Sequence, residues 1–254
     1  MSAPLYQHTA ELFDLRYAHK DYAGEAATLS RLLDRIHPRA VTLLDVACGT
    51  GRHLEHLRSH YRVEGIDRSH ELLKTARKRV GDAPLHEGDM TRFALGRAFD
   101  VVTCFFASIA YLGSVEGLHE AVSNMAKHLS AGGVLFIEPF LTPTVYREGE
   151  VVHNIRKTPE QTLSWMYVMR RRADVAVWDI HWLVGTAGED VEHFVEHEEL
   201  KMFATDEYVR ALRDAGLDVC HHARGLHGYG AFLGRKDARW SPDDLASISE
   251  ILPA

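Results

Sequence analysis

The sequence predicts an α/β fold in which helices cover both faces of a mainly parallel sheet. Over the first 140 residues, short apolar runs of strand length alternate with stretches of helical periodicity. Strands and helices that alternate in this way form a parallel sheet, whose ligand binds beyond the carboxyl ends of the strands. From about residue 162 to residue 203, apolar and polar side chains alternate instead, which predicts an antiparallel β insertion.

The elements of the parallel sheet follow one another along the chain. We expect strands at residues 41–47, 61–67, 84–87, 99–106 and 134–137, and two last strands at 217–223 and 229–234. We expect helices at residues 24–36, from 52, about 70–80, 118–129 and 205–216. Ser69 is expected to cap its helix and Gly81 to end it. Gly132-Gly133 is expected to end the helix before it, and Thr205 to cap the last helix.

The insertion is expected to cover the open end of the parallel sheet. Its apolar residues alternate with polar ones and therefore point to one face of a strand; they are Trp178, Ile180, Trp182 and Val184. Aromatic side chains in this pattern are typical of a core. Residues 185–190 predict a hairpin turn, and residues 191–202 predict the returning strand.

Composition indicates which partners and environments to expect, namely whether the protein binds nucleic acid, a membrane or a metal ion and whether it forms disulfides. The 254 residues carry a formal net charge of -7, which argues against nucleic acid. The three cysteines are far apart in sequence, so we expect no disulfide and a reducing cytoplasm. No apolar run approaches the roughly 20 residues that span a bilayer, so we expect no membrane. The 17 histidines show no metal-ligand spacing, and we expect no metal.

Residues suited to bind an adenosine cofactor follow the first three expected strands. In the segment Asp-Val-Ala-Cys-Gly-Thr-Gly, the small residues Ala47, Gly49 and Gly51 let the backbone approach a ligand, and the following helix presents its N–H groups. Asp67 ends the next strand, where a carboxylate accepts two hydrogen bonds from a ribose diol. Asp89 is positioned to accept from an adenine amino group, with Met90 against the ring.

A nicotinamide dehydrogenase is the main alternative for this loop. Its fingerprint is G-x-G-x-x-G/A, and the third glycine permits close packing of the helix. Counting from Gly49, the third position is Leu54. The dinucleotide fingerprint therefore fails.

Residues 41–140 resemble class I S-adenosylmethionine-dependent methyltransferases, a Rossmann-like fold. The resemblance rests on four segments: 44–51, Gly65-Ile66-Asp67, Gly88-Asp89-Met90 and 129–133. It implies S-adenosyl-L-methionine as cofactor, with the first loop at its methionine part, the second acid at the ribose and the third at the adenine. It also implies a seven-stranded sheet whose last hairpin strand is antiparallel. Phe13, Arg68 and Phe105 complete the expected cofactor contacts.

Three further segments, 20–26, 107–112 and Glu138-Pro139, are similar to bacterial N,N-dimethyltransferases that act on nucleotide-linked 3-amino-deoxysugars. This resemblance implies that Tyr22 and Glu25 lie at the nucleotide-sugar and that Ser108 and Tyr111 line the substrate side. The chain departs from that pattern at two places. The segment 140–142, Phe-Leu-Thr, differs from the aromatic residues found right after Glu-Pro in that family. Tyr229, which we also expect at the substrate, stands near the place of an arginine that helps hold the nucleotide.

Methyl transfer is an in-line displacement, so holding the reactants in line is most of the task. An amine acceptor must be neutral, and deprotonating one with the pKa of lysine at pH 7 costs about 4.6 kcal/mol. Tyr6, Tyr111 and His227 are the candidates for a proton relay. An oxygen or carbon acceptor requires a general base, for which His227 is the leading candidate.

The sequence therefore predicts a methyltransferase domain over residues 1–240. Within it, residues 1–37 form a helical cap and residues 141–203 an antiparallel lid, and residues 241–254 form a peripheral tail. The expected substrate is a small molecule, most simply the amine of an amino-sugar or a related natural-product intermediate. An O- or C-methyltransferase, an NAD-dependent oxidoreductase, an RNA methyltransferase and a non-catalytic cofactor-binding protein remain alternatives. Whether the protein forms a homodimer is left open by the sequence.

Overall fold

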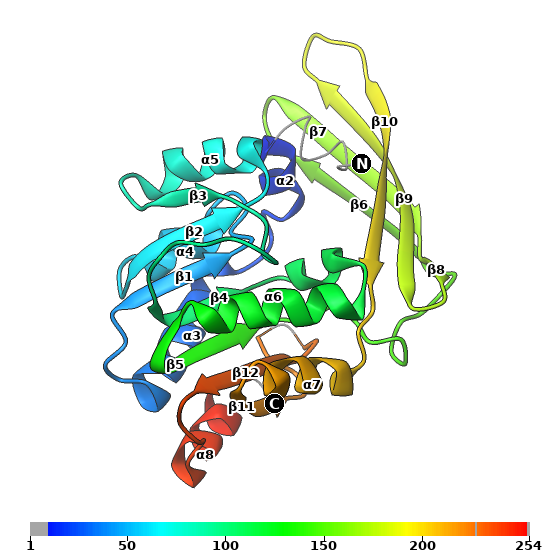
Figure 1. Ribbon diagram of the computed structural model, residues 1–254. Helices are drawn as coiled ribbons and strands as arrows, with labels where there is room; N and C mark the ends of the chain where they lie inside the picture. Colours follow the sequence, from blue (N-terminus) through cyan, green and yellow to red (C-terminus); the bar gives the residue numbers. More distant parts are fainter. Residues whose placement is uncertain (1–9, 227, 253–254) are drawn as a thin grey trace.

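The computed structural model describes residues 10–226 and 228–252, and its main body is a seven-stranded sheet (Figure 1). The strands are β1 (Thr42–Val46), β2 (Arg62–Asp67), β3 (Leu85–Glu87), β4 (Phe99–Cys104), β5 (Leu129–Ile137), β11 (Leu217–His222) and β12 (Ala231–Lys236). Their order is β11-β12-β5-β4-β1-β2-β3, and β12 runs antiparallel to both of its neighbours. The expected seven-stranded sheet with an antiparallel last hairpin strand is confirmed.

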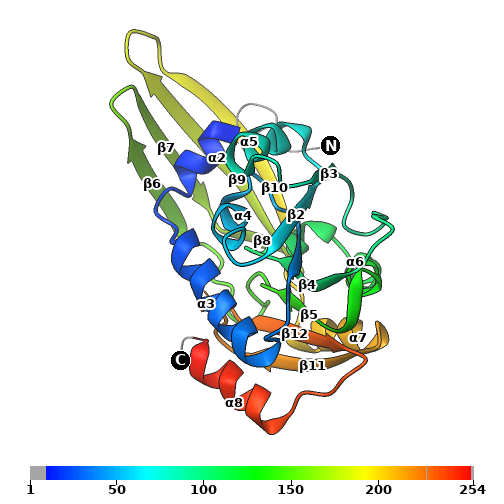
Figure 2. The same cartoon turned by 90° about the vertical axis from the view of Figure 1, so that its left-hand side faces the viewer.

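Helices cover both faces of this sheet (Figure 2). On one face lie α3 (Tyr22–Ile36), α4 (Arg52–Leu57), α5 (His70–Val80) and α8 (Pro242–Ile251). On the other lie α6 (Val115–Lys127) and α7 (Thr205–Asp214). Successive strand residues point to opposite faces, so Leu43 packs into one layer and Leu44 into the other, both fully buried. Burial on both faces explains why the central strands are continuous apolar runs.

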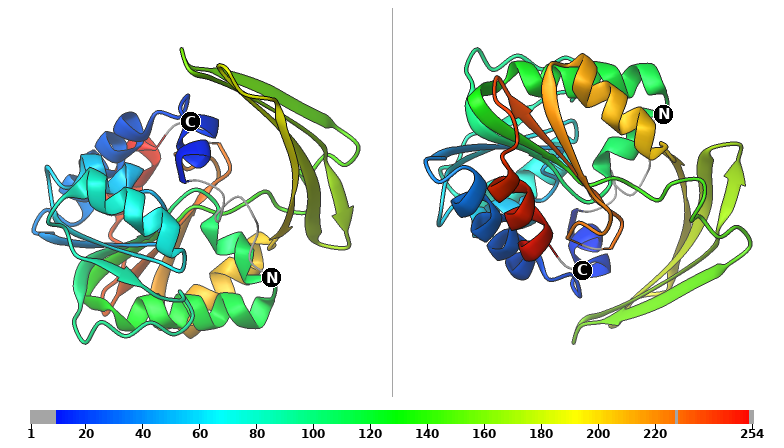
Figure 3. Two further views of the ribbon diagram at one scale, coloured as in Figure 1. Left: turned by 90° about the horizontal axis from the view of Figure 1, so that it is seen from above. Right: turned by 90° about the horizontal axis from the view of Figure 1, so that it is seen from below.

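A second, antiparallel sheet stands beside the main body (Figure 1). Its strands are β6 (Val151–Lys157), β7 (Gln161–Val168), β9 (Val175–Thr186) and β10 (Glu192–Lys201), in the order β10-β9-β7-β6, with β8 (Arg170–Arg172) paired to β9. Trp178 and Trp182 are buried on one face, as their alternation predicts, and Trp165 of β7 is buried beside them. Helix α2 (Ala10–Arg16) lies between this face and the main body, as the view from above shows (Figure 3).

Two predicted helix boundaries are wrong. Helix α6 ends at Lys127, and Gly132 and Gly133 lie inside β5, where the pairing with β4 shifts register. A Cβ at Gly133 would come within 3.0 Å of the Asp100 carbonyl oxygen, so this glycine permits a close strand approach rather than ending a helix. Thr205 is the first residue of α7 and not its cap; Ala204 precedes it, and the Glu207 carboxylate accepts from the Ala204 N–H at 2.7 Å.

The expectation of a peripheral tail is also wrong. Residues 242–251 form α8, which packs on α3 and β11. Ser241 caps the helix, and Pro242 occupies its first turn, where a missing N–H costs nothing. Ile248 of this helix and Leu252 just after it are buried in the same core layer as α3.

Within the described residues, no helix combines the length and apolar character needed to cross a bilayer. In the same part of the chain, no three His, Cys, Asp or Glu side chains gather where a metal ion could be held. Cys48, Cys104 and Cys220 are free.

Candidate active site

The glycine-rich loop leaves β1 at the carboxyl edge of the sheet and turns into α4. Three of its residues have positive φ, namely Ala47 (60°), Gly49 (56°) and Gly51 (76°). A Cβ at Gly51 would lie 3.2 Å from the side chains of Ala76 and Val80, whereas a Cβ at Gly49 would meet nothing within 4 Å. The loop therefore packs tightly on α5 at Gly51 and presents bare backbone to open space at Gly49. This arrangement fits a ligand that approaches the backbone closely.

Asp67, at the end of β2, stabilises this loop by hydrogen bonds. One carboxylate oxygen accepts from the Gly49 N–H at 2.8 Å, and the other accepts from the Ser69 N–H at 2.8 Å. Burial raises the pKa of Asp67, and the backbone donors offset part of that rise. The carboxylate lies beside the open backbone of Gly49, which is where the sequence places a ribose contact. The residues present fit an adenosine cofactor.

Replacing Asp67 by alanine is expected to weaken the binding of S-adenosylmethionine by roughly 1–3 kcal/mol, the scale for losing a buried hydrogen-bond partner. Titration calorimetry with S-adenosylmethionine and S-adenosylhomocysteine measures the effect for both forms of the cofactor. Glu87→Gln is the matched control, because Glu87 ends the next strand but is exposed and pairs with His70 at 3.0 Å. Unchanged affinity in Asp67→Ala would show that the ribose contact lies elsewhere.

The other expected cofactor residues lie around this edge with different exposure. Asp89 follows β3, and its carboxylate accepts from the Thr91 N–H at 2.9 Å. Met90 packs against the apolar layer under α6. Arg68 is exposed. Phe105 is buried, with its ring stacked on that of His53 at a centroid distance of 4.1 Å.

Helix α2 is tied to the glycine-rich loop through Asp14, a residue that sequence reasoning missed. Its carboxylate accepts from the Thr50 hydroxyl at 2.7 Å and pairs with Arg52 at 3.2 Å and Arg79 at 2.5 Å. The contacts join α2 to the loop, α4 and α5. They hold the N-terminal helix against the carboxyl edge of the sheet at the glycine-rich loop, the expected cofactor edge. Phe13 on the same helix packs edge-to-face with Tyr17 at a centroid distance of 4.9 Å.

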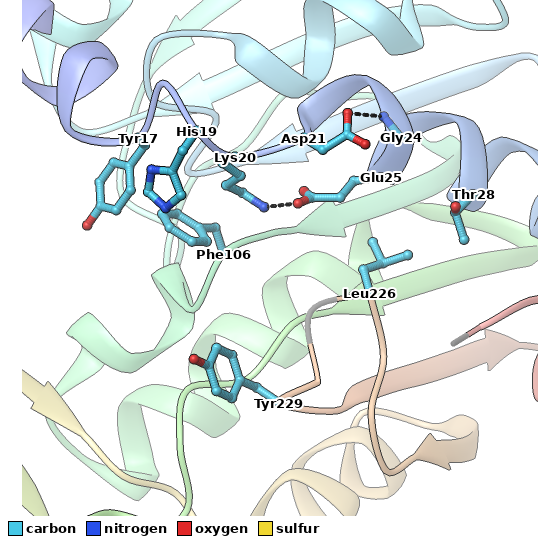
Figure 4. A pocket seen from close by; sticks show the side chains of 10 residues that line it. All are labelled: Tyr17, His19, Lys20, Asp21, Gly24, Glu25, Thr28, Phe106, Leu226 and Tyr229. Atoms are coloured by element: carbon cyan, nitrogen blue, oxygen red, sulfur yellow. Dashed lines mark hydrogen bonds and ion pairs between the residues drawn. The ribbon is translucent and has the colours of Figure 1, made fainter. Parts of the chain in front are cut away.

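A cavity of about 560 Å³ opens beside this edge (Figure 4). Its lining residues are Tyr17, His19, Lys20, Asp21, Gly24, Glu25, Thr28, Phe106, Leu226 and Tyr229. Lys20 and Glu25 point toward one another on one side, and Leu226 and Tyr229 come from the β11–β12 loop on the opposite side (Figure 4). Two of the expected substrate residues, Glu25 and Tyr229, therefore share one cavity although they are far apart in sequence.

Glu25 joins two other ionisable groups in a buried cluster. One of its oxygens accepts from the Lys20 ammonium, and the other lies 2.7 Å from Nε2 of His53. All three side chains are less than a tenth exposed. Tyr22 closes the cluster, because its ring packs edge-on against His53 at 4.9 Å.

Burial sets the protonation of this cluster. It lowers the pKa of His53, so the ring is neutral at pH 7 and its Nε2–H donates to Glu25. Burial also lowers the pKa of Lys20, and the charge of Glu25 opposes that fall. Glu25 is thus fixed by a donor on each side, with its carboxylate at the cavity wall.

The remaining predicted residues are spread around the site. Ser108 begins and Tyr111 nearly ends the 3-10 helix η1 (Ser108–Leu112), which follows β4. Tyr111 is 39% exposed and does not belong to the cavity lining described above. Tyr6 and His227 lie outside the described residues.

Sequence reasoning missed Lys20 and His53 as parts of the site. A signal for His53 existed, because it stands two residues after Gly51 in the first turn of α4, at the cofactor edge. Lys20 directly precedes the N-cap Asp21 of α3, whose side chain accepts from the Gly24 N–H at 2.9 Å. That cap fixes the turn and so directs Lys20 toward Glu25.

Comparison with known proteins places this geometry in context. Residues 43–133 match a family model described as a methyltransferase domain. The chain is 38% identical over 228 residues to a dTDP-3-amino-3,4,6-trideoxy-alpha-D-glucopyranose N,N-dimethyltransferase of Streptomyces venezuelae; the match covers 89% of this chain and 96% of that relative.

Two solved structures have the same fold. Streptomyces venezuelae DesVI superposes with a TM-score of 0.85 and 37% identity, over 89% of this chain and 98% of that one. CalS10, an amino pentose methyltransferase from Micromonospora echinaspora involved in calicheamicin biosynthesis, was solved with SAM bound. It gives a TM-score of 0.81 and 35% identity, over 87% of this chain and 94% of that one.

Proposed function

Since the chain belongs to the S-adenosylmethionine-dependent methyltransferases, in the family of the amino-sugar N,N-dimethyltransferases, we propose that its acceptor is the amine of a dTDP-linked amino-sugar. The structural observation that supports this acceptor is the cavity beside the cofactor edge. Its wall presents the buried Glu25 carboxylate, a hydrogen-bond acceptor suited to an amine, fixed between Lys20 and His53.

In this proposal S-adenosylmethionine supplies an electrophilic methyl group on its sulfonium. The backbone at Gly49 and the Asp67 carboxylate would hold its methionine and ribose parts, and Asp89 and Met90 would hold its adenine. Glu25 accepts a hydrogen bond from the sugar amine and orients its lone pair. Correct alignment of the reacting groups supplies about 7–11 kcal/mol of the barrier reduction in well-oriented systems. Helix α2 and the second sheet cover the site and exclude water.

A methyl-transfer assay with labelled S-adenosylmethionine tests the acceptor. The panel contains dTDP-linked 3-amino and 4-amino sugars, the matched dTDP-sugar with a hydroxyl group at the same carbon, and a small amine without a sugar. We expect one or two methyl groups on an amino-sugar, counted by mass spectrometry, and none on the hydroxyl analogue. Transfer to the hydroxyl analogue alone would instead favour an O-methyltransferase.

We also propose that the chain forms a homodimer through the outer face of the second sheet. Apolar residues are exposed on that face, namely Val151, Ile155, Met166, Val168, Leu183 and Val195. At one end of that face Arg170 pairs with Asp179 and Arg172 with Glu199, so the exposed apolar residues adjoin charges that are already balanced within the chain, and apolar contact with a second copy supports the dimer. Sedimentation equilibrium is expected to give twice the chain mass, and Val195→Glu to give the single mass.

The proposed location is the cytoplasm. Three free cysteines, two of them buried, fit a reducing compartment. Fractionation of the producing cell, with detection of the chain in the cytoplasmic fraction, tests this.

A further inference from the structure

Arg156 brings a cation to the edge of the cavity. It lies on β6, and its Nη2 donates to Nδ1 of His19 at 2.8 Å across 137 residues of sequence. His19 stands in the turn between α2 and α3 and lines the cavity (Figure 4). The guanidinium therefore adjoins the cavity wall although no sequence motif connects the two residues.

No carboxylate within residues 10–226 and 228–252 pairs with the charge of Arg156. In the described part of the chain its side chain donates to two neutral acceptors, the Ile155 carbonyl oxygen at 3.0 Å and Nδ1 of His19, and its Nε is buried without a partner. Other cations near the site are paired, Lys20 with Glu25 and Arg16 with Glu198. A guanidinium has five N–H donors in a planar fork that fits phosphate oxygens. With one Nη hydrogen on each of the two neutral acceptors and Nε buried, two Nη hydrogens of Arg156 remain for an anion.

The contact also fixes His19. A guanidinium only donates, so Nδ1 of the ring is the acceptor and the neutral ring carries its hydrogen on Nε2. That hydrogen is a second donor at the same edge of the cavity. On the opposite side stands Tyr229, 57% exposed, which offers no permanent charge to an anion.

We propose that Arg156 and His19 form an anion subsite that binds the diphosphate of the nucleotide-linked sugar. This rests on the proposed function and adds the residues that select a nucleotide-linked over a free sugar. An anion held at this edge leaves the sugar to extend into the cavity toward Glu25. Arg156 is then a specificity-determining residue, and the second sheet contributes it to the site.

Binding of dTDP, measured by calorimetry in the presence of S-adenosylhomocysteine, tests the subsite without catalysis. Arg156→Gln is expected to weaken dTDP binding about 10- to 100-fold, the scale for a charge-assisted contact, and His19→Ala to weaken it less. Arg172→Gln is the matched control, because Arg172 is also an arginine of this sheet but pairs with Glu199. It should bind dTDP like the wild type. Equal affinity of Arg156→Gln and the wild type, or no binding of dTDP by either, overturns the proposal.

Kinetics separate this inference from the proposed function. Arg156→Gln is expected to raise KM for the dTDP-linked amino-sugar about 10- to 100-fold, with KM for the free amino-sugar unchanged. An equal rise for both acceptors would mean that Arg156 only supports the fold and would overturn the subsite. If the wild type binds dTDP through Arg156 but methylates no amino-sugar, the proposed function fails and the anion subsite stands.

Discussion

Replacing Glu25 by alanine is expected to lower kcat/KM for the amine acceptor at least 100-fold, on the scale of about 10²–10⁴ for a positioned proton-transfer or hydrogen-bonding group. The carboxylate lies at the cavity wall and is held by Lys20 on one side and His53 on the other. Without it the acceptor amine loses its fixed hydrogen-bond partner. The Lys20 ammonium also becomes the nearest charge, and it repels any cationic amine. Steady-state kinetics with the amino-sugar measure the loss.

The same substitution is expected to destabilise the fold. Removing one partner of a buried charge pair costs about 3–5 kcal/mol, because the other charge stays buried. Glu25→Gln keeps the side-chain volume and a hydrogen-bond acceptor but removes the charge. Urea unfolding should rank the wild type above Glu25→Gln and Glu25→Gln above Glu25→Ala. A fully stable, fully active Glu25→Ala variant would contradict both the ion-pair cluster and the role of Glu25 at the acceptor.

The positions of the strands along the chain and the cofactor loop could be predicted because their signals are local. Apolar runs, glycines and caps each specify a few adjacent residues, and the spacing from Gly49 to Asp67 follows from one α-helix between two parallel strands. Leu54 illustrates this: it is fully buried, and a Cβ at Gly65 would come within 2.7 Å of it. The same residue that breaks the dinucleotide fingerprint fills the space between α4 and β2.

The cavity wall could not be predicted in the same way. The contact of Glu25 with His53 joins α3 to α4, and that of His19 with Arg156 joins the N-terminal turn to the second sheet. Each depends on how elements far apart in sequence pack. In the single sequence these residues look like ordinary polar positions at the ends of elements. Only the resemblance to a family suggested Glu25, and nothing suggested Arg156.

Asp45 is expected to make the stability of the protein fall as the pH rises from about 4 to about 8. It is 1% exposed, and its carboxyl accepts from the Thr103 hydroxyl at 2.9 Å. Burial raises its pKa from 3.8 to about 8. Between these values the unfolded chain is ionised while the folded chain keeps the proton, so the unfolded state binds fewer protons and stability drops with pH. At about 1.4 kcal/mol per pKa unit, the loss is on the order of 6 kcal/mol, complete above about pH 8.

Asp45→Asn removes this dependence, because an amide of the same shape accepts from Thr103 and does not ionise. The unfolding free energy of the wild type minus that of Asp45→Asn is expected to fall by roughly 4 kcal/mol between pH 5 and pH 8. Asp100 provides the opposite control. Burial alone would raise its pKa, but hydrogen bonds from the Val41 and Thr42 N–H groups lower it overall. The Asp100→Asn difference should therefore stay flat over this range and shrink only as the pH falls below about 4. If the difference in unfolding free energy between the wild type and Asp45→Asn is also flat between pH 5 and pH 8, Asp45 is ionised in the folded protein. The expected pH dependence is then wrong.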